Sequence, residues 1–210
     1  AAPGEWVSYR DAYRAMVVFE KYGKPKNFIQ NHYQVMAREK GTSLDGVHLS
    51  LQSKTLHLNL PLDATGRTVF PFLKAAYDEN AALVLDRKLA NYVFRARISI
   101  VVQADGLYDS AHLRVACEQA LAWQRHLDAS AGSRKCTGVR FAFSGKDGEP
   151  EVRLRTGAGR ETVLPAVTGS AFSDDPNAAF RVVNYRFADT PYSGQVVTTD
   201  APLAIAALIE

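Results

Sequence analysis

Arginine recurs at alternate positions in two segments whose residue types favour β-strands. The residues between the arginines are apolar, so the arginine side chains are expected on the solvent face of a sheet. If the two strands are neighbours, their guanidinium groups form a patch suited to carboxylate or phosphate groups. Alternatively, Glu151, Glu161 and Asp86 pair with the arginines across strands and give an ordinary solvated sheet face. The four arginines of this candidate ligand-binding face are Arg95, Arg97, Arg153 and Arg155.

Two histidines occupy polar positions of a predicted β-hairpin. Apolar and polar residues alternate over 47–52 and over 56–60, and pairing Leu49 with Leu58 places the apolar residues on one face. A turn at 53–54, or a four-residue loop of the same parity, joins the strands. His48 and His57 then become diagonal neighbours on the polar face. A zinc site needs three or four ligands and no third is evident, so no metal site is predicted.

Closely spaced oxygens at 174–177 (Asp-Asp-Pro-Asn) could hold calcium, but the segment lacks the glycine and the distant glutamate of an EF-hand loop. Its residue types are those of an ordinary turn. Gly157-Ala158-Gly159 begins like a dinucleotide-binding fingerprint, yet it joins two predicted strands, whereas the fingerprint must open a helix. We interpret it as a turn.

The chain has no signature of a known catalytic centre. It contains no HExxH, no phosphate-binding P-loop, no GxSxG elbow and no N-glycosylation acceptor. Serines and histidines that could serve as nucleophile and base are present, but their convergence cannot be read from spacing. The sequence therefore predicts no catalytic residue and no cofactor. Exposed aromatic platforms for sugars are only weakly indicated, with Trp123 expected in the core and Tyr108 and Tyr192 beside glycines.

Charge and hydropathy bear on two classes of protein. The net charge of +3, from 25 basic and 22 acidic residues, is small, whereas dedicated nucleic-acid domains usually show a more concentrated positive field, so there is no strong nucleic-acid signal. No stretch approaches the roughly 20 apolar residues of a membrane-spanning helix. At 210 residues, with 47% hydrophobic residues, the chain is expected to bury a substantial core.

Cys117 and Cys136 are the only two cysteines, and their spacing fits no redox or zinc motif. In an oxidising compartment they would form a disulfide; in the cytoplasm they would be two buried thiols. The chain begins Ala-Ala-Pro-Gly, as cleavage of a signal peptide or trimming would leave it. We expect a periplasmic or secreted protein, with a cytoplasmic one as the alternative.

Helical periodicity marks two segments, 9–22 and 109–128. Ser8 and Asp11 resemble a capping box at the start of the first, and Asp109 or Ser110 is a good N-cap for the second. With many predicted strands, they indicate an α+β fold, mostly antiparallel sheet with the two amphipathic helices packed on one face. A single domain over 1–210 is predicted, with a candidate subdomain boundary near 145–150. Further strands are predicted at 28–38, 68–72, 81–86, 92–100, 138–143, 152–155, 161–165, 180–187 and 194–199, while 203–209 fits a short helix or a buried strand.

Together these features favour an exported, non-catalytic binding or interaction module for a partner protein or an anionic envelope polymer. An enzyme such as a hydrolase, with a site assembled from scattered residues, is the first alternative. Convergence of a histidine, a carboxylate and a serine or threonine in one cleft would favour it. A structural or assembly component is the second alternative, favoured by an exposed hydrophobic strand edge.

Overall fold

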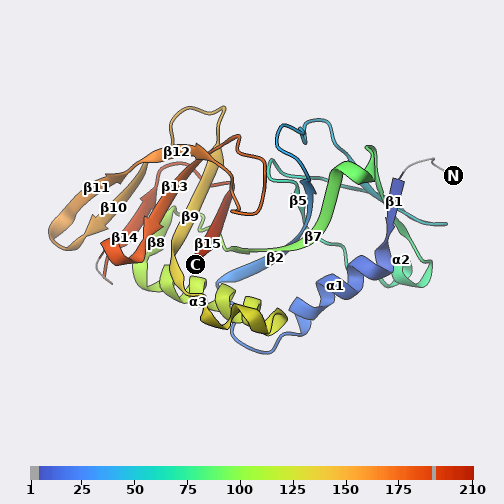
Figure 1. The fold of residues 1–210 in the computed structure, drawn as a ribbon, viewed down its shortest axis with the longest axis horizontal. Coiled ribbons are helices and arrows are strands. Elements are labelled where there is room, and N and C mark those ends of the chain that lie inside the picture. The colour runs from blue at the N-terminus through green and yellow to red at the C-terminus, as the bar shows by residue number, and fades with distance from the viewer. Residues whose placement is uncertain (1–4, 191–192) are drawn as a thin grey trace. The chain divides into compact units, whose positions relative to one another are not determined.

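The computed structural model describes residues 5–190 and 193–210, and its contacts divide the chain into two compact units (Figure 1). Unit 1 contains the residues up to Lys24 and Asn31–Arg97, and unit 2 contains Pro25–Gln30 and Ile98–Glu210. The single-domain assignment stays a prediction. The segment near 145–150 lies inside unit 2, between two of its strands.

Unit 1 begins with a short strand that leads directly into helix α1 (Tyr9–Lys21). The side chain of Ser8 accepts a hydrogen bond from the backbone N–H of Asp11 at 3.3 Å, as the predicted cap requires. The inner face of α1 packs Tyr9, Ala12 and Met16 into the core of the unit. The other elements of unit 1 are β1 (Glu5–Ser8), β2 (Ile29–Ala37), β3 (Leu49–Gln52), β4 (His57–Leu60), β5 (Arg67–Thr68), α2 (Lys74–Asp78), β6 (Ala82–Leu85), η1 (Leu89–Asn91) and β7 (Tyr92–Ile100), of which β2 and β7 extend past the unit boundary.

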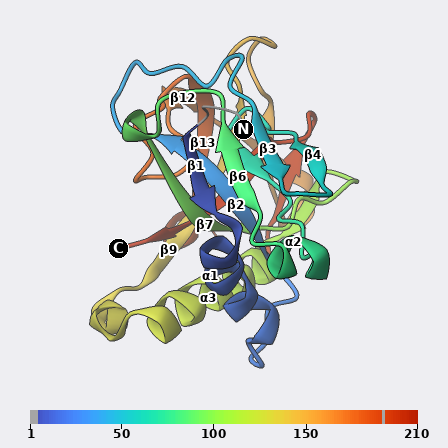
Figure 2. The ribbon, with the colours of Figure 1, turned by 90° about the vertical axis from the view of Figure 1, so that its right-hand side faces the viewer.

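The main sheet of unit 1 is antiparallel and has the strand order β1-β6-β3-β4, which Figure 2 shows face on. Leu49, Leu51, Leu83 and Leu85 on the two central strands are buried. The alternate residues of the same strands face the other way. A second, three-stranded sheet has the order β5-β2-β7.

The predicted β3–β4 hairpin is confirmed with its four-residue loop and a register moved by two residues. Leu51 lies opposite Leu58 and Leu49 opposite Leu60. Because the shift is an even number of residues, each side chain stays on the face of the sheet where it was predicted. The pairing of Leu49 with Leu58 is wrong, since Ser-Lys is a poor two-residue turn and the loop takes four residues instead. Leu58 on the outer strand is 38% exposed, although its face is the apolar one.

Unit 2 contains two four-stranded antiparallel sheets, with orders β11-β10-β14-β8 and β12-β13-β9-β15. Helix α3 packs against β8, β9 and β15. The ambiguous tail is a strand, β15, because its apolar residues are buried beside β9. The elements of unit 2 are β8 (Leu107–Asp109), α3 (Ser110–Leu127), η2 (Ala129–Ser133), β9 (Cys136–Ser144), β10 (Val152–Thr156), η3 (Gly157–Gly159), β11 (Arg160–Leu164), β12 (Ala166–Gly169), β13 (Phe180–Arg186), η4 (Phe187–Asp189), β14 (Gln195–Thr198) and β15 (Ala204–Ile209).

A disulfide joins Cys117 of α3 to Cys136 at the start of β9, as the sequence predicted for an oxidising compartment. The Cα atoms lie 6.0 Å apart, a usual separation for this bond. The α+β class and its two main helices, α1 and α3, are confirmed. Within the described residues, no helix combines the length and apolar character needed to cross a bilayer.

Candidate ligand-binding face

The four predicted arginines fall in different environments. Arg97 of β7 is buried rather than on the solvent face, and this expectation was wrong. Its Nε donates to Oε1 of Gln34 at 2.7 Å, so a polar network holds the guanidinium in the interior. Arg95 is partly buried, and its Nε donates to the carbonyl of Ala96 at 3.1 Å. Both belong to unit 1, whereas Arg153 and Arg155 belong to unit 2.

Carboxylates pair with the two arginines of β10. The Nε of Arg153 donates to Glu151 Oε1 at 2.8 Å, and Arg155 Nε lies 3.2 Å from Glu161 Oε1. Both acids belong to the set that the sequence offered as the alternative to a binding patch. Glu161 pairs across strands from β11, whereas Glu151 lies two residues before Arg153 in the chain and not on a neighbouring strand. Asp86, the third acid, instead pairs with its neighbour Arg87. A ligand-binding role for the arginines stays a prediction.

The two hairpin histidines are not diagonal neighbours. The shifted register places His57 opposite Gln52, whereas His48 lies beyond the other end of the paired segment. His48 lies beside Asp86, with Nδ1 3.9 Å from Oδ2. Among the residues that the structure describes, no three His, Cys, Asp or Glu side chains converge as metal ligands.

The structure shows the surroundings of three other candidates from the sequence. In the 174–177 segment, the Asp175 carboxylate accepts from the backbone N–H of Asn177 at 2.9 Å, which is ordinary turn chemistry. Trp123 is in the core as predicted, and Tyr108 is buried, not exposed. Tyr192 lies outside the described residues.

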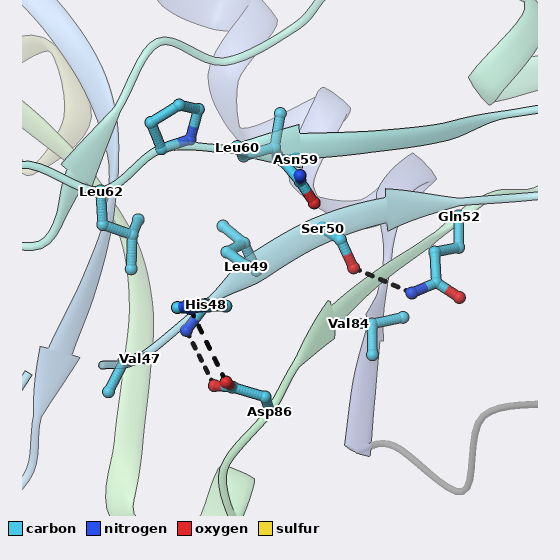
Figure 3. Close-up of a pocket in the computed structure, with 11 residues that line it drawn as sticks. Val47, His48, Leu49, Ser50, Gln52, Asn59, Leu60, Leu62, Val84 and Asp86 are labelled. Carbon is cyan, nitrogen blue, oxygen red and sulfur yellow. Dashed lines mark hydrogen bonds and ion pairs between the residues drawn. The ribbon is translucent and has the colours of Figure 1, made fainter. Parts of the chain in front are cut away.

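A groove of about 540 Å³ lies on the polar face of the main sheet of unit 1 (Figure 3). In Figure 3 the side chains of His48 and Asp86 lie against each other, and Ser50 is directed toward Gln52. Val84 and Leu62 add apolar surface beside them. The residues that line the groove are Val47, His48, Leu49, Ser50, Gln52, Asn59, Leu60, Pro61, Leu62, Val84 and Asp86.

Strand register assembles this face. Val84 of β6 lies opposite Ser50 of β3, and Ser50 lies opposite Asn59 of β4. Directly opposed residues in antiparallel strands project from the same face. The sequence predicted the alternation that turns Ser50 outward, but the pairing of β3 with β6, from a distant segment, left no local signal.

An exposed tryptophan extends the same row. Trp6 of β1 lies opposite Val84, so the row across the sheet reads Trp6, Val84, Ser50, Asn59. Trp6 is 59% exposed. Sequence reasoning missed it because β1 has only four residues, the last of which is the helix cap Ser8, too few for a clear alternation.

The charged groups of the groove are paired with each other. Asp86 Oδ1 accepts the backbone N–H of His48 at 2.8 Å, and Asp86 Oδ2 lies 3.2 Å from Arg87 Nη1. Arg87 is anchored in turn by the carbonyl of Gly46 at 3.0 Å. The amide of Gln52 donates to Ser50 Oγ at 2.9 Å, which leaves the amide oxygen, one amide hydrogen and the hydroxyl proton for a ligand.

A second cavity, of about 390 Å³, lies in unit 2 at the start of α3. Three of its polar side chains contact one another. Asp109 Oδ1 accepts from Gln195 Nε2 at 3.2 Å, and Asp109 Oδ2 lies 3.5 Å from His112 Nδ1. The groove of unit 1 is the better candidate, because it is larger than this cavity and its Ser50–Gln52 contact leaves donor and acceptor groups available.

A buried polar network lies next to His32 in unit 1. The pKa of His32 is lowered, mainly because burial disfavours the charged imidazole and secondly because of the Arg67 cation. Its Nδ1 has no hydrogen-bond partner, as befits a neutral ring. The Arg67 side chain is 4% exposed and pairs with Asp63, with Nε 3.3 Å from Oδ2.

Replacing His32 with glutamine is expected to reduce the acid sensitivity of unfolding. Above the unfolded pKa of about 6.5 the ring is neutral in both states and contributes nothing. As the pH falls below that value, the unfolded state takes up the proton first, so the wild type loses stability until the folded pKa is passed. Urea denaturation at pH 7.5 and 5.0 measures this loss. His57→Gln, on an exposed strand, controls for losing a histidine from the unfolded chain; equal losses in both variants would contradict the prediction.

Searches against protein-family models, curated proteins and solved structures find no match to this chain.

Proposed function

We propose that the protein is a non-catalytic binding module that acts outside the cytoplasm, on an envelope polymer or a partner protein. Its ligand occupies the groove of unit 1. The observation that carries this proposal is the row of exposed or half-exposed side chains from Trp6 to Asn59 on the polar face of the sheet. A concave surface with a few convergent polar groups beside apolar ones is the usual form of a ligand site.

Action outside the cytoplasm is supported by the Cys117–Cys136 disulfide. Structural disulfides persist in oxidising compartments and are rare where thioredoxin and glutathione keep thiols reduced. A periplasmic or secreted protein that binds an envelope polymer would meet its ligand in such a compartment.

Hydrolysis is the second candidate function, because His48, Asp86 and Ser50 line one groove. Asp86 lies on the Nδ1 side of His48, as in a catalytic triad. However, His48 directly precedes β3 and is two residues from Ser50, a spacing that in extended chain separates the Cβ atoms by roughly 6.6 Å. Ser50 Oγ is engaged by Gln52, and Figure 3 shows it directed away from His48. The arrangement favours binding over nucleophilic attack.

Cosedimentation with purified peptidoglycan sacculi tests the proposal. Ser50→Trp fills the groove from a position that faces away from the core, so binding is expected to weaken by about tenfold or more, the loss of at least 1.4 kcal/mol. Val163→Trp adds the same ring to the exposed strand β11 and is expected to bind like the wild type.

Equal binding by the wild type and Ser50→Trp, or no binding by either, would refute the groove as the site for this polymer. Release of fragments from the sacculi by the wild type, abolished in Ser50→Ala and His48→Ala, would establish the hydrolase instead.

A further inference from the structure

We infer that the groove of unit 1 binds a run of neutral pyranose sugars, as in the glycan strand of an envelope polymer, with one ring stacked on Trp6. This inference rests on the proposed function and names its ligand class. It is carried by the order of side chains across the sheet, by the exposure of Trp6 and by the pairing of the charges in the groove.

The row is an extended platform. From Trp6 on β1 to Asn59 on β4 there are three inter-strand steps of about 4.8 Å, roughly 14 Å in all. This span suits an extended chain better than a single small molecule. Trp6 and Val84 provide an apolar half, and Ser50 and Asn59 provide a polar half. Sugar rings present the same combination, with C–H faces and hydroxyl edges.

The polar half is matched to hydroxyl groups. A hydroxyl both donates and accepts hydrogen bonds, and its best partners do the same. Ser50, Gln52 and Asn59 all combine donor and acceptor groups, and all three line the groove. Side chains of this kind select ligands by hydrogen-bond geometry rather than by charge.

The charge of the groove does not favour a strongly ionic ligand. The charged or titratable side chains that line it are His48 and Asp86, and Asp86 is paired with Arg87. An anion would meet the Asp86 carboxylate, and a cation would have to displace Arg87 from it. A neutral sugar is not repelled by the Asp86 carboxylate and does not have to displace Arg87. An anionic polymer would therefore be recognised here by its sugar rings and not by its charged substituents.

A peptide strand is the competing occupant, because β4 is the edge of its sheet. The backbone N–H of Ser53 donates to the carbonyl of Leu56, so alternation along β4 turns the N–H and C=O groups of His57 and Asn59 outward. Added strands use such edges and place alternate side chains over the face. However, Pro61 directly after β4 lacks an N–H and shortens this edge.

Tryptophan fluorescence provides the test, because the chain has only two tryptophans. Trp6 is 59% exposed and Trp123 is 5% exposed. In a Trp123→Phe background, Trp6 is the sole reporter. Titration with hexa-N-acetylchitohexaose, cellohexaose or maltohexaose is expected to change its emission and to protect it from acrylamide for at least one of the three. Raising the salt to 0.5 M is expected to leave this binding unchanged, since charge pairing is screened and stacking is not.

Matched variants separate the roles by calorimetry with the same oligosaccharide. Trp6→Ala is expected to weaken binding about tenfold or more, and Trp6→Phe to retain most of it, because an aromatic face remains. Asn59→Ala is expected to weaken binding by about threefold to tenfold through a lost hydrogen bond. Leu127→Ala, at an exposed apolar residue of unit 2, is the control.

The outcomes distinguish the two proposals. If none of the three oligosaccharides binds while Ser50→Trp still abolishes binding to sacculi, the sugar inference is wrong and the groove binds another part of the polymer. Binding of stem peptides released from the sacculi, lost on Asn59→Pro but not on Trp6→Ala, would assign the site to a peptide strand. If Ser50→Trp has no effect on sacculi, the proposed function itself fails.

Discussion

Asp63→Ala is expected to lower the free energy of unfolding by about 3 kcal/mol, near the lower end of the range for breaking a buried ion pair. Asp63 is the carboxylate partner of Arg67, whose side chain is 4% exposed, while that of Asp63 is 40% exposed. Its Oδ1 also accepts from Thr65 Oγ1 at 2.6 Å and from the backbone N–H of Arg67 at 3.0 Å. Without Asp63, the buried guanidinium keeps its desolvation cost but loses this partner.

Two further variants isolate the cause. Asp63→Asn keeps the turn hydrogen bonds and removes the charge, so its loss should lie between that of alanine and the wild type. Asp78→Ala removes the acid of an i,i+4 pair with Lys74, the same spacing as Asp63 and Arg67, but on the surface. Exposed pairs contribute little. Urea denaturation giving the same loss for Asp63→Ala and Asp78→Ala would contradict the interpretation.

Removal of the Cys117–Cys136 disulfide is the second large effect. The two cysteines are 19 residues apart in sequence, and opening a loop of that length is expected to lower the free energy of unfolding by about 3 kcal/mol on the chain-entropy model. The double variant Cys117→Ala, Cys136→Ala measures this loss by urea denaturation. Cys117 is fully buried in α3, which packs against β9, so lost packing adds to this destabilisation.

Reduction distinguishes the contribution of the disulfide bond to the free energy of unfolding from the contribution of side-chain packing. Dithiothreitol should destabilise the wild type and leave the double alanine variant unchanged. A thiol titration of the unfolded wild type, under non-reducing conditions and from its native compartment, should find no reactive thiol. Two reactive thiols per chain in this titration would contradict the prediction and would also remove the main support for export.

The elements with clear local periodicity could be predicted from sequence. Helix α1 begins after its Ser8 cap, α3 occupies the predicted segment, and the hairpin kept its parity. The short strand β1 and helix α2 were not predicted, because four or five residues carry little periodic signal. The tail was ambiguous until its pairing with β9 decided it. Pairing between distant segments is set by tertiary packing, which local patterns do not encode.

The same distinction explains the site. The outward direction of His48 and Ser50 followed from alternation within one strand. The pairing of that strand with β6, and of β6 with β1, could not be inferred from alternation. Trp6 and Val84 were therefore not associated with the site. Arg97 was expected on the solvent face because it alternates with apolar residues, yet it is buried and donates a hydrogen bond to Gln34. Composition and alternation predict faces, whereas register decides which residues share a site.

Sacculi binding by two variants tests the central claim most directly. Ser50→Trp fills the groove of unit 1, and the double variant Arg153→Ala, Arg155→Ala removes the arginines of β10. The account predicts that the first loses most of its affinity and that the second binds like the wild type. Normal binding by Ser50→Trp, together with loss of binding in the arginine variant, would contradict this account and would assign the ligand site to the arginines of β10.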